Sequence, residues 1–244
     1  MTEPDTYDAY YYWDPVCPFS WITSRWVEKV VTQRGYQVDW RFISLRLVNK
    51  DVDYASTFPS DYEDGHTAGL RLLRMAAKVR AENGRSVMGP LYTALGESIF
   101  DIDQAEFNKS AFGTAAHVAP ILELLGLSAD YADALDDDTF DAEIQAETDE
   151  ARTKTGEDVG TPIIHYKPPA GPALFGPVIS RVPADEDAAV LWDHVVGLAS
   201  FPSFTELKRS LREMPALKAL GADEPTAGRI QDWHGGTTRR PDLE

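Results

Sequence analysis

One stretch near the start of the chain restricts what this protein can fold into. Residues 9–13 are apolar or aromatic, Asp14-Pro15 interrupts the run, and a helical pattern follows from Pro18. Proline is favoured in the first turn of a helix, and Gly35 suits a left-handed cap at its end. Side chains at helical spacing predict one buried face, formed by Ile22, Trp26, Val27, Val30 and Val31. We therefore expect a strand followed by an amphipathic helix.

Cys17 stands at the predicted start of this helix and is the only cysteine in the chain. The free backbone N–H groups and the positive end of the helix dipole at such a position favour a thiolate. Cysteines in such sites have pKa values lowered to about 3.5–7.5. We therefore expect a reactive cysteine with a lowered pKa, and a buried structural cysteine is the alternative.

A second strand is predicted directly after the helix. Val38, Trp40 and Phe42 alternate with polar residues, as expected for a strand with one buried face. A strand, a helix and a strand of this length form a βαβ unit with parallel strands and a right-handed crossover. Sites in open α/β sheets lie at the carboxyl ends of strands, which is where Cys17 is expected.

The second half of the chain contains further strand and helix signals. Strand patterns at 159–166 and 173–176 flank a turn rich in proline and glycine, which predicts an antiparallel hairpin. Residues 185–200 predict a helix, and residues 204–220 predict another. In the tail we expect order only where Ile230 and Trp233 can pack.

Helical patterns fill the region between these halves. Each expected helix has apolar spacing and a cap or stop: one through Leu72 and Val79 to Asn83-Gly84, one from Pro90, one capped by Asp103 through Ala111, one ending at Gly126, and one from about Thr139. The acidic stretch at 130–150 lacks the spacing of a calcium loop, so we interpret it as a solvated helical face. The patterns together predict an α/β domain (1–46 and 156–205), a helical insertion (47–155), and a C-terminal helix and tail (206–244).

The formal net charge of −17 argues against binding to nucleic acid or to an anionic membrane surface. A single cysteine excludes an internal disulfide, and no apolar run approaches membrane-spanning length. The first residues lack the basic and apolar regions of a signal peptide, so we expect a cytoplasmic protein. The five histidines show no metal-binding spacing, so we expect no metal site.

A β-α-β half, a helical insertion and a β-β-α half resemble the thioredoxin-like fold of the DsbA family. Cys17-Pro18-Phe19-Ser20 is similar to the family's Cys-Pro-x-Cys motif with serine in place of the second cysteine. Gly160-Thr161-Pro162 resembles the loop that ends in a cis-proline beside the active-site cysteine. The resemblance implies an α/β, thioredoxin-like fold with a helical DsbA-type insertion, and Pro162 close to Cys17.

Within that family, the chain resembles the mycothiol-dependent nitroreductase and reductase group. The stretches that carry the similarity are 14–26, 90–96, 156–162, 175–178 and 204–209. The resemblance implies a low-molecular-weight thiol as cosubstrate, either mycothiol or a glutathione-like molecule, and no tightly bound cofactor. It also implies a small disulfide or electrophile as the second substrate. The oligomeric state stays open, with a homodimer as one option.

Serine at position 20 changes the implied chemistry. In the dithiol relatives the second cysteine resolves the mixed disulfide, and serine is too weak a nucleophile toward sulfur to do so. We therefore expect monothiol chemistry, with Cys17 as the nucleophile, activated by the N–H groups of Phe19 and Ser20, and a second thiol molecule releasing it. The Ser20 hydroxyl either donates a hydrogen bond to the thiolate or fills the place of the lost cysteine.

The resemblance also implies a set of residues that contact the substrate: Pro18, Phe19, Trp21, Asn49, Tyr62, Thr161 and Pro162. Phe19 and Trp21 could instead belong to the core. Asn49 could be a helix cap, and Tyr62 could be an ordinary surface residue. The Thr161 backbone would pair with an extended thiol or peptide beside Cys17.

Two other functions are compatible with these residues. A kappa-type glutathione transferase or a 2-hydroxychromene-2-carboxylate isomerase-like enzyme would stabilise the thiolate of a bound cosubstrate and form no disulfide with the protein. A non-catalytic DsbA-like binding or chaperone protein would retain the scaffold without the chemistry. Cys17 itself occupies the nucleophile position, which favours the monothiol oxidoreductase.

Overall fold

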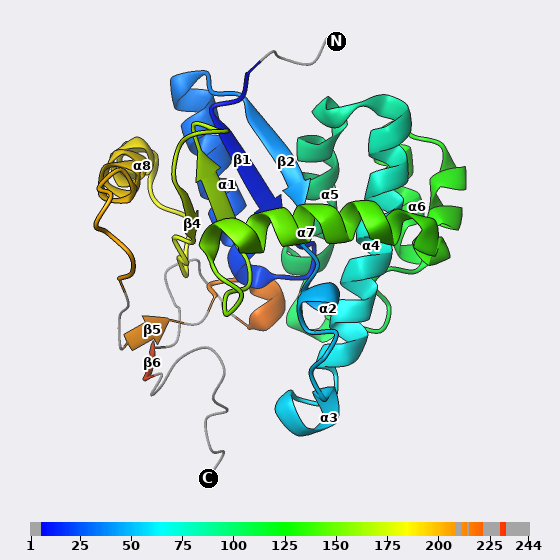
Figure 1. Ribbon diagram of the computed structural model, residues 1–244. Coiled ribbons are helices and arrows are strands. Elements are labelled where there is room, and N and C mark those ends of the chain that lie inside the picture. Colours follow the sequence, from blue (N-terminus) through cyan, green and yellow to red (C-terminus); the bar gives the residue numbers. More distant parts are fainter. Residues whose placement is uncertain (1–5, 208–210, 214, 222–229, 233–244) are drawn as a thin grey trace.

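The computed structural model describes residues 6–207, 211–213, 215–221 and 230–232. A four-stranded sheet with the order β2-β1-β3-β4 lies at its centre (Figure 1). β1 (Ala9–Trp13) pairs in parallel with β2 (Val38–Phe42), and α1 (Pro18–Arg34) connects them. On its other side β1 pairs antiparallel with β3 (Ile163–Tyr166), which pairs antiparallel with β4 (Ala173–Phe175). The predicted βαβ unit and hairpin are therefore confirmed.

Helices cover both faces of this sheet. α1 packs with α8 (Asp185–Ala199) on one side, where the Trp26 indole donates a 2.8 Å hydrogen bond to the Ala188 carbonyl. α7 (Asp141–Thr155) crosses the other side and contacts β2 and β4 (Figure 1). Alternate side chains of β1 follow this division, since Tyr11 lies in the larger core and Tyr12 in the smaller cluster beneath α7. The aromatic strand β1 is therefore buried on both of its faces.

The insertion is helical, as predicted, and apart from α7 it lies to one side of the sheet (Figure 1). With the central sheet it gives a thioredoxin-like fold with a helical insertion. Its α-helices are α2 (Leu45–Val48), α3 (Tyr54–Thr57), α4 (Tyr62–Asn83), α5 (Met88–Phe100), α6 (Ala115–Leu124) and α7. Its 3-10 helices are η1 (Arg85–Val87), η2 (Gln104–Glu106), η3 (Ala129–Asp136) and η4 (Asp138–Phe140). α7 packs on the sheet itself, and the predicted domain boundaries stay predictions.

The helix predicted from Asp103 through Ala111 is wrong. Only the 3-10 turn η2 forms there, and the Asn108 side chain then accepts hydrogen bonds from the backbone and hydroxyl of Ser110. Such local side-chain bonds compete with helix formation. Gly113, at a φ of +67°, then precedes α6. The segment is therefore a loop beside the first turn of α4.

The predicted C-terminal helix is also wrong where the structure describes that region. Residues 204–207 are irregular, and β5 (Leu211–Glu213) pairs antiparallel with β6 (Ile230–Asp232). The 3-10 helix η5 (Lys218–Leu220) lies between these two strands in the chain. Pro215 cannot donate a helical hydrogen bond, which disfavours a continuous helix over 204–220. Trp233, expected to pack with Ile230, lies outside the described residues.

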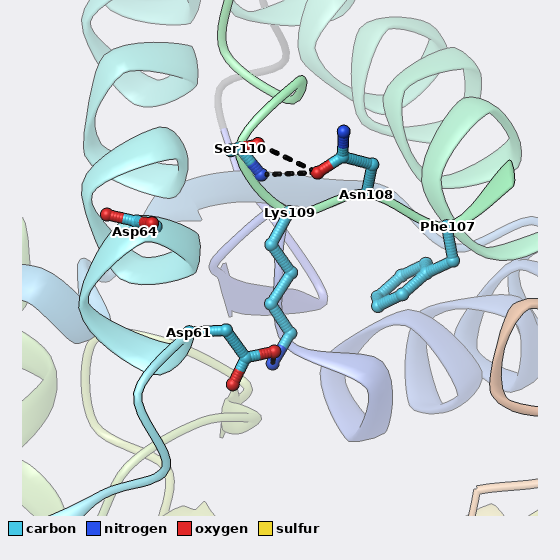
Figure 2. Close-up of a pocket in the computed structure, with 6 residues that line it drawn as sticks. All are labelled: Asp61, Asp64, Phe107, Asn108, Lys109 and Ser110. Carbon is cyan, nitrogen blue, oxygen red and sulfur yellow. Dashed lines mark hydrogen bonds and ion pairs between the residues drawn. The ribbon is translucent and has the colours of Figure 1, made fainter.

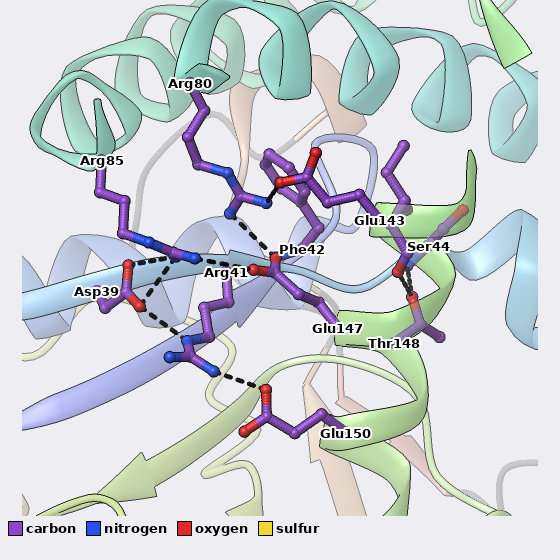
Figure 3. A network of polar contacts seen from close by, with 11 residues as sticks. Asp39, Arg41, Phe42, Ser44, Arg80, Arg85, Glu143, Glu147, Thr148 and Glu150 are labelled. Atoms are coloured by element: carbon purple, nitrogen blue, oxygen red, sulfur yellow. Dashed lines mark hydrogen bonds and ion pairs between the residues drawn. The ribbon is translucent and has the colours of Figure 1, made fainter. Parts of the chain in front are cut away.

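An ion-pair network joins the acidic helix α7 to the rest of the protein (Figure 3). Arg80 of α4 contacts Glu143 at 2.6 Å and Glu147 at 3.1 Å. Glu147 also accepts a 2.7 Å hydrogen bond from the Phe42 backbone, and Glu150 binds Arg41 of β2. The interpretation of this stretch as a solvated face is therefore wrong for α7, because its acids pair with arginines of distant elements.

The described part of the chain contains no group of three or more histidine, cysteine, aspartate or glutamate side chains arranged to hold a metal ion. No helix in it is long and apolar enough to cross a membrane.

Candidate active site

Cys17 is the N-cap residue of α1, one short turn beyond β1. Pro18 occupies the first turn of the helix, and Gly35 caps the other end at a φ of +66°, as predicted. The backbone N–H of Ser20 donates to the Cys17 sulfur at 3.4 Å. The local sequence therefore places the sulfur against the free N–H groups at the helix start.

The loop before β3 completes the site from the opposite end of the chain. The Thr161–Pro162 peptide bond is cis, and both residues are buried. The Cys17 thiol donates to the Thr161 carbonyl over a sulfur–oxygen distance of 3.6 Å. The Thr161 hydroxyl donates to the Tyr12 carbonyl at 3.3 Å, which holds this loop against β1. The structure therefore brings Cys17 and the Thr161–Pro162 loop together, as the resemblance implied.

The expectation of a lowered pKa at Cys17 is wrong in this structure. Only 7% of Cys17 is exposed, and this burial raises the pKa of the thiol to about 12. The Asp14 carboxylate raises the pKa further, while the N–H groups of Ser20 and Phe19 lower it. Loss of hydration therefore outweighs the helix terminus, since burial disfavours the charged form of a thiol. Cys17 is held as a thiol, the only form that can donate to Thr161.

Asp14 is a functional candidate that the sequence reasoning missed. It is fully buried and accepts hydrogen bonds from the backbone N–H groups of Val16 at 2.9 Å and Leu45 at 2.7 Å. Burial raises the pKa of Asp14 to about 7, although those two N–H groups lower it. An acidic residue between a buried strand and a helix-capping cysteine was the available sequence signal. Buried carboxyls with perturbed pKa values are concentrated at functional sites.

Ser20 lies in the first turn of α1 and is fully buried. Its hydroxyl accepts a 3.1 Å hydrogen bond from Tyr92 of α5 and lies 3.4 Å from the Tyr11 hydroxyl. It forms no hydrogen bond with the Cys17 sulfur, which contacts Ser20 only through the backbone N–H. In this state Ser20 ties the start of α1 to β1 and α5, so its proposed action on the thiolate stays a prediction.

Trp21 does not contact substrate, because only 2% of it is exposed. Its indole ring packs against Tyr92 and Phe100. A Cβ atom at Gly96 would lie 2.1 Å from two ring carbons of Trp21, so only glycine allows this close approach of α1 and α5. Pro18 and Phe19, in contrast, are half-buried and lie next to Cys17.

Tyr62 and Asn49 differ in how the structure places them. Tyr62, 38% exposed, is close enough to Cys17 that the thiolate charge contributes to raising the pKa of its hydroxyl, after burial and Asp61. It stacks on Phe58 with a centroid distance of 5.5 Å. The Asn49 amide instead donates to the Leu45 carbonyl at 2.8 Å and closes α2. The structure therefore leaves Tyr62 partly exposed at the start of α4 and uses the Asn49 amide nitrogen as a cap.

Comparison with known proteins places this site in a family. Residues 16–209 match the Rv2466c-like family, described as mycothiol-dependent nitroreductase Rv2466c. The chain belongs to this family. It is therefore a thiol-dependent oxidoreductase, and membership in the family indicates a low-molecular-weight thiol as cosubstrate. The match confirms the resemblance to the mycothiol-dependent nitroreductase and reductase group.

Two kinds of relatives accompany this match. The uncharacterized protein Rv2286c of Mycobacterium tuberculosis is 30% identical over 200 residues, which cover 82% of this chain and 80% of that protein. Among solved structures, the cytosolic disulfide reductase DsbM from Pseudomonas aeruginosa is 16% identical, with a TM-score of 0.47 over 78% of this chain and 99% of that chain. The reduced disulfide bond oxidoreductase DsbG from Mycobacterium tuberculosis is 19% identical, with a TM-score of 0.46 over 78% and 88%.

Proposed function

We propose that this protein is a monothiol oxidoreductase in which Cys17 forms a mixed disulfide with a mycothiol-like thiol. The observation that carries the proposal is the juxtaposition of Cys17, the Ser20 N–H group and the Thr161 carbonyl at one end of the sheet. Family membership supplies the thiol cosubstrate. Because the chain has one cysteine, no resolving thiol is present within it.

The exchange is balanced by two thiols from solution. In the first step the Cys17 sulfur attacks one sulfur of a substrate disulfide, and the proton of Cys17 ends on the departing thiol. In the second step the thiolate of the cosubstrate attacks the Cys17 sulfur of this mixed disulfide, which releases the second substrate thiol and leaves Cys17 in a mixed disulfide with the cosubstrate. In the third step a second cosubstrate thiolate attacks the cosubstrate sulfur of that mixed disulfide and releases Cys17. The substrate disulfide gains two electrons, and two cosubstrate thiols become one disulfide.

The groups around Cys17 have separate roles in substrate binding and in the exchange itself. The hydrogen bond from the thiol to Thr161 must break before the sulfur attacks, which frees that carbonyl for an extended substrate. The N–H groups of Phe19 and Ser20 then remain to stabilise the thiolate when it forms or leaves. We assign substrate contact to half-buried Phe19, which is two residues from Cys17, and to exposed Tyr62 at the start of α4.

A covalent trap tests the proposal directly. Wild-type protein incubated with mycothiol disulfide should gain the mass of one mycothiol on Cys17, and excess mycothiol should remove it. Cys17→Ser should gain no mass and should lose reductase activity at least about 1,000-fold, because serine cannot exchange with disulfides. Ser20→Ala is the matched control and should still form the adduct. A Cys17 that stays unmodified by the disulfide at every pH would overturn the proposal.

The raised pKa of Cys17 supports a second candidate function. A thiol that stays protonated can donate a hydrogen bond to the thiolate of a bound cosubstrate, as in a transferase or isomerase. The cosubstrate would then attack the electrophile, and no disulfide with the protein would form. Cys17→Ser should retain activity in that case, since a serine hydroxyl donates the same bond. The same variant therefore separates the two functions.

Other parts of the expected function stay with this proposal. We assign a small disulfide or electrophile as second substrate, and a nitro compound belongs in the same assay because of the family's described activity. A cytoplasmic location agrees with reduction by a low-molecular-weight thiol. Homodimer formation stays a prediction, to be measured by light scattering.

A further inference from the structure

A hollow of about 220 Å³ opens between the first turn of α4 and the loop that replaces the predicted helix. Figure 2 shows the acidic side chains on the α4 side, Phe107 and Asn108 on the opposite side, and Lys109 between them. Its lining is formed by Asp61, Asp64, Phe107, Asn108, Lys109 and Ser110. These residues have no role in the exchange at Cys17 described above.

The hollow lies along the face of α4 that also packs on the segment preceding Cys17. The Lys109 ammonium group is 4.3 Å from the centroid of the Tyr62 ring and 2.8 Å from an Asp61 carboxylate oxygen. Gly65 packs on the Lys109 side chain, and Gly69, one turn further along the same face of α4, packs on Asp14 and Val16. A cosubstrate whose sulfur reaches Cys17 can therefore extend along this face of α4 into the hollow.

The lining favours hydroxyl groups over charged groups. Asp61 already pairs with Lys109, whereas Asp64 forms no ion pair with any described residue. The Asn108 carbonyl oxygen is bound by Ser110, and its amide nitrogen donates to no other described residue. Carboxylates accept hydrogen bonds from hydroxyls, and amide nitrogens donate to them. The Phe107 ring supplies an apolar surface for the carbon face of a ring-shaped ligand.

The net charge of the hollow also favours uncharged ligands over anionic ones. Two carboxylates and one ammonium group leave the hollow with one net negative charge, and the chain as a whole carries −17. An anionic thiol is repelled by both, while an uncharged one is not.

We propose that this hollow is the subsite for the uncharged, hydroxyl-rich part of the thiol cosubstrate. The inference rests on the proposed function, because it places the sulfur end of the same molecule at Cys17. A thiol such as mycothiol, with hydroxylated rings and no charge, fits the lining. The hollow discriminates against anionic thiols such as glutathione.

Binding of unreactive cosubstrates tests this inference separately from the chemistry. S-methyl mycothiol and S-methyl glutathione cannot form disulfides, and calorimetry with the full chain measures their affinities. S-methyl mycothiol should bind at least about 10-fold more tightly than S-methyl glutathione. Asp64→Ala and Asn108→Ala should each weaken the binding of S-methyl mycothiol about 3- to 10-fold, the range expected for the loss of one hydrogen bond. Asp64→Lys should increase the affinity for S-methyl glutathione, because it replaces a negative charge in the hollow by a positive one.

Matched variants keep the result interpretable. Asp130→Ala removes the same charge at an exposed position outside the hollow and should leave both affinities unchanged. Asp64 and Asn108 are exposed, so their variants should fold, which circular dichroism checks. Equal affinities for the two ligands, no binding of either, or S-methyl mycothiol binding that neither variant changes would overturn the subsite. A mixed disulfide that still forms on Cys17 would then leave the proposed function standing.

Discussion

Two regions of this molecule bury ionisable groups, and they treat them in opposite ways. In the network of Figure 3, Asp39, Glu143, Glu147 and Glu150 are all matched by arginines. At the candidate active site, Asp14 is buried with two backbone N–H groups and no cation among the described residues. Cys17 lies beside it and is also almost fully buried.

The presence or absence of a cationic partner decides what each buried carboxylate does. A paired buried carboxylate stabilises the arrangement of the elements that supply its partners, and α4, α7 and β2 are joined in this way. A buried carboxyl without a cationic partner, such as Asp14, has a raised pKa and can change its protonation near neutral pH. The network therefore fixes the insertion on the sheet, and Asp14 makes the site sensitive to pH.

Removing the charge of Arg80 should give the largest loss of stability. Its side chain is 4% exposed, and Arg80→Met would leave the buried Glu147 carboxylate with the Phe42 N–H and only the longer ion pair to Arg85. Breaking one partner of a buried pair costs about 3–5 kcal/mol of unfolding free energy. Urea denaturation measures this change. Asp136→Ala, which breaks an exposed pair with Arg71, is the control and should cost less than about 1 kcal/mol.

A second variant makes the Arg80 result decisive. Arg80→Met with Glu147→Gln removes the uncompensated charge but keeps an acceptor for the Phe42 N–H. It should be more stable than Arg80→Met alone. Equal losses in the single and double variants would show that packing, and not an unpaired charge, dominates at Arg80.

Asp14 should make the stability of the protein fall with rising pH. Its pKa is raised from 3.8 to about 7 in the folded state, so the folded protein binds the proton more tightly than the unfolded chain. The stabilising effect is complete below pH 4 and is lost as the pH rises through about 7. The loss is about 2–4 kcal/mol at most. Asp14→Asn should therefore flatten the change in unfolding free energy between pH 5 and pH 8, and an unchanged slope would contradict the assignment.

Local patterns in the sequence predicted the parts of the fold that are determined locally. β1, α1 with its cap at Gly35, and β2 agree with the prediction, because strand alternation and helix caps act within a few residues. The helix expected at Asp103 failed because the polar turn at Asn108 competes with it.

The candidate site was predictable only in its components. Cys17 and the Thr161–Pro162 loop could be identified from motifs, and the structure brings them together. The pKa of Cys17 could not, since it depends on burial by elements distant in the chain. Trp21 is in the core because of Gly96 on another helix, a pairing that no local pattern contains.

The smallest expected effect concerns the direct influence of Asp14 on Cys17. The Asp14 carboxylate contributes to the raised pKa of the thiol, after burial itself. Asp14→Asn removes that negative charge, so a larger fraction of Cys17 should be thiolate at pH 8. Alkylation by iodoacetamide, followed by mass spectrometry of the single cysteine, should become about 3- to 10-fold faster. Asp130→Asn, at an exposed position, should leave the rate unchanged. Slower alkylation in Asp14→Asn would reverse the interpretation, because it would mean that the carboxylate accepts the proton of Cys17 and does not merely repel the thiolate.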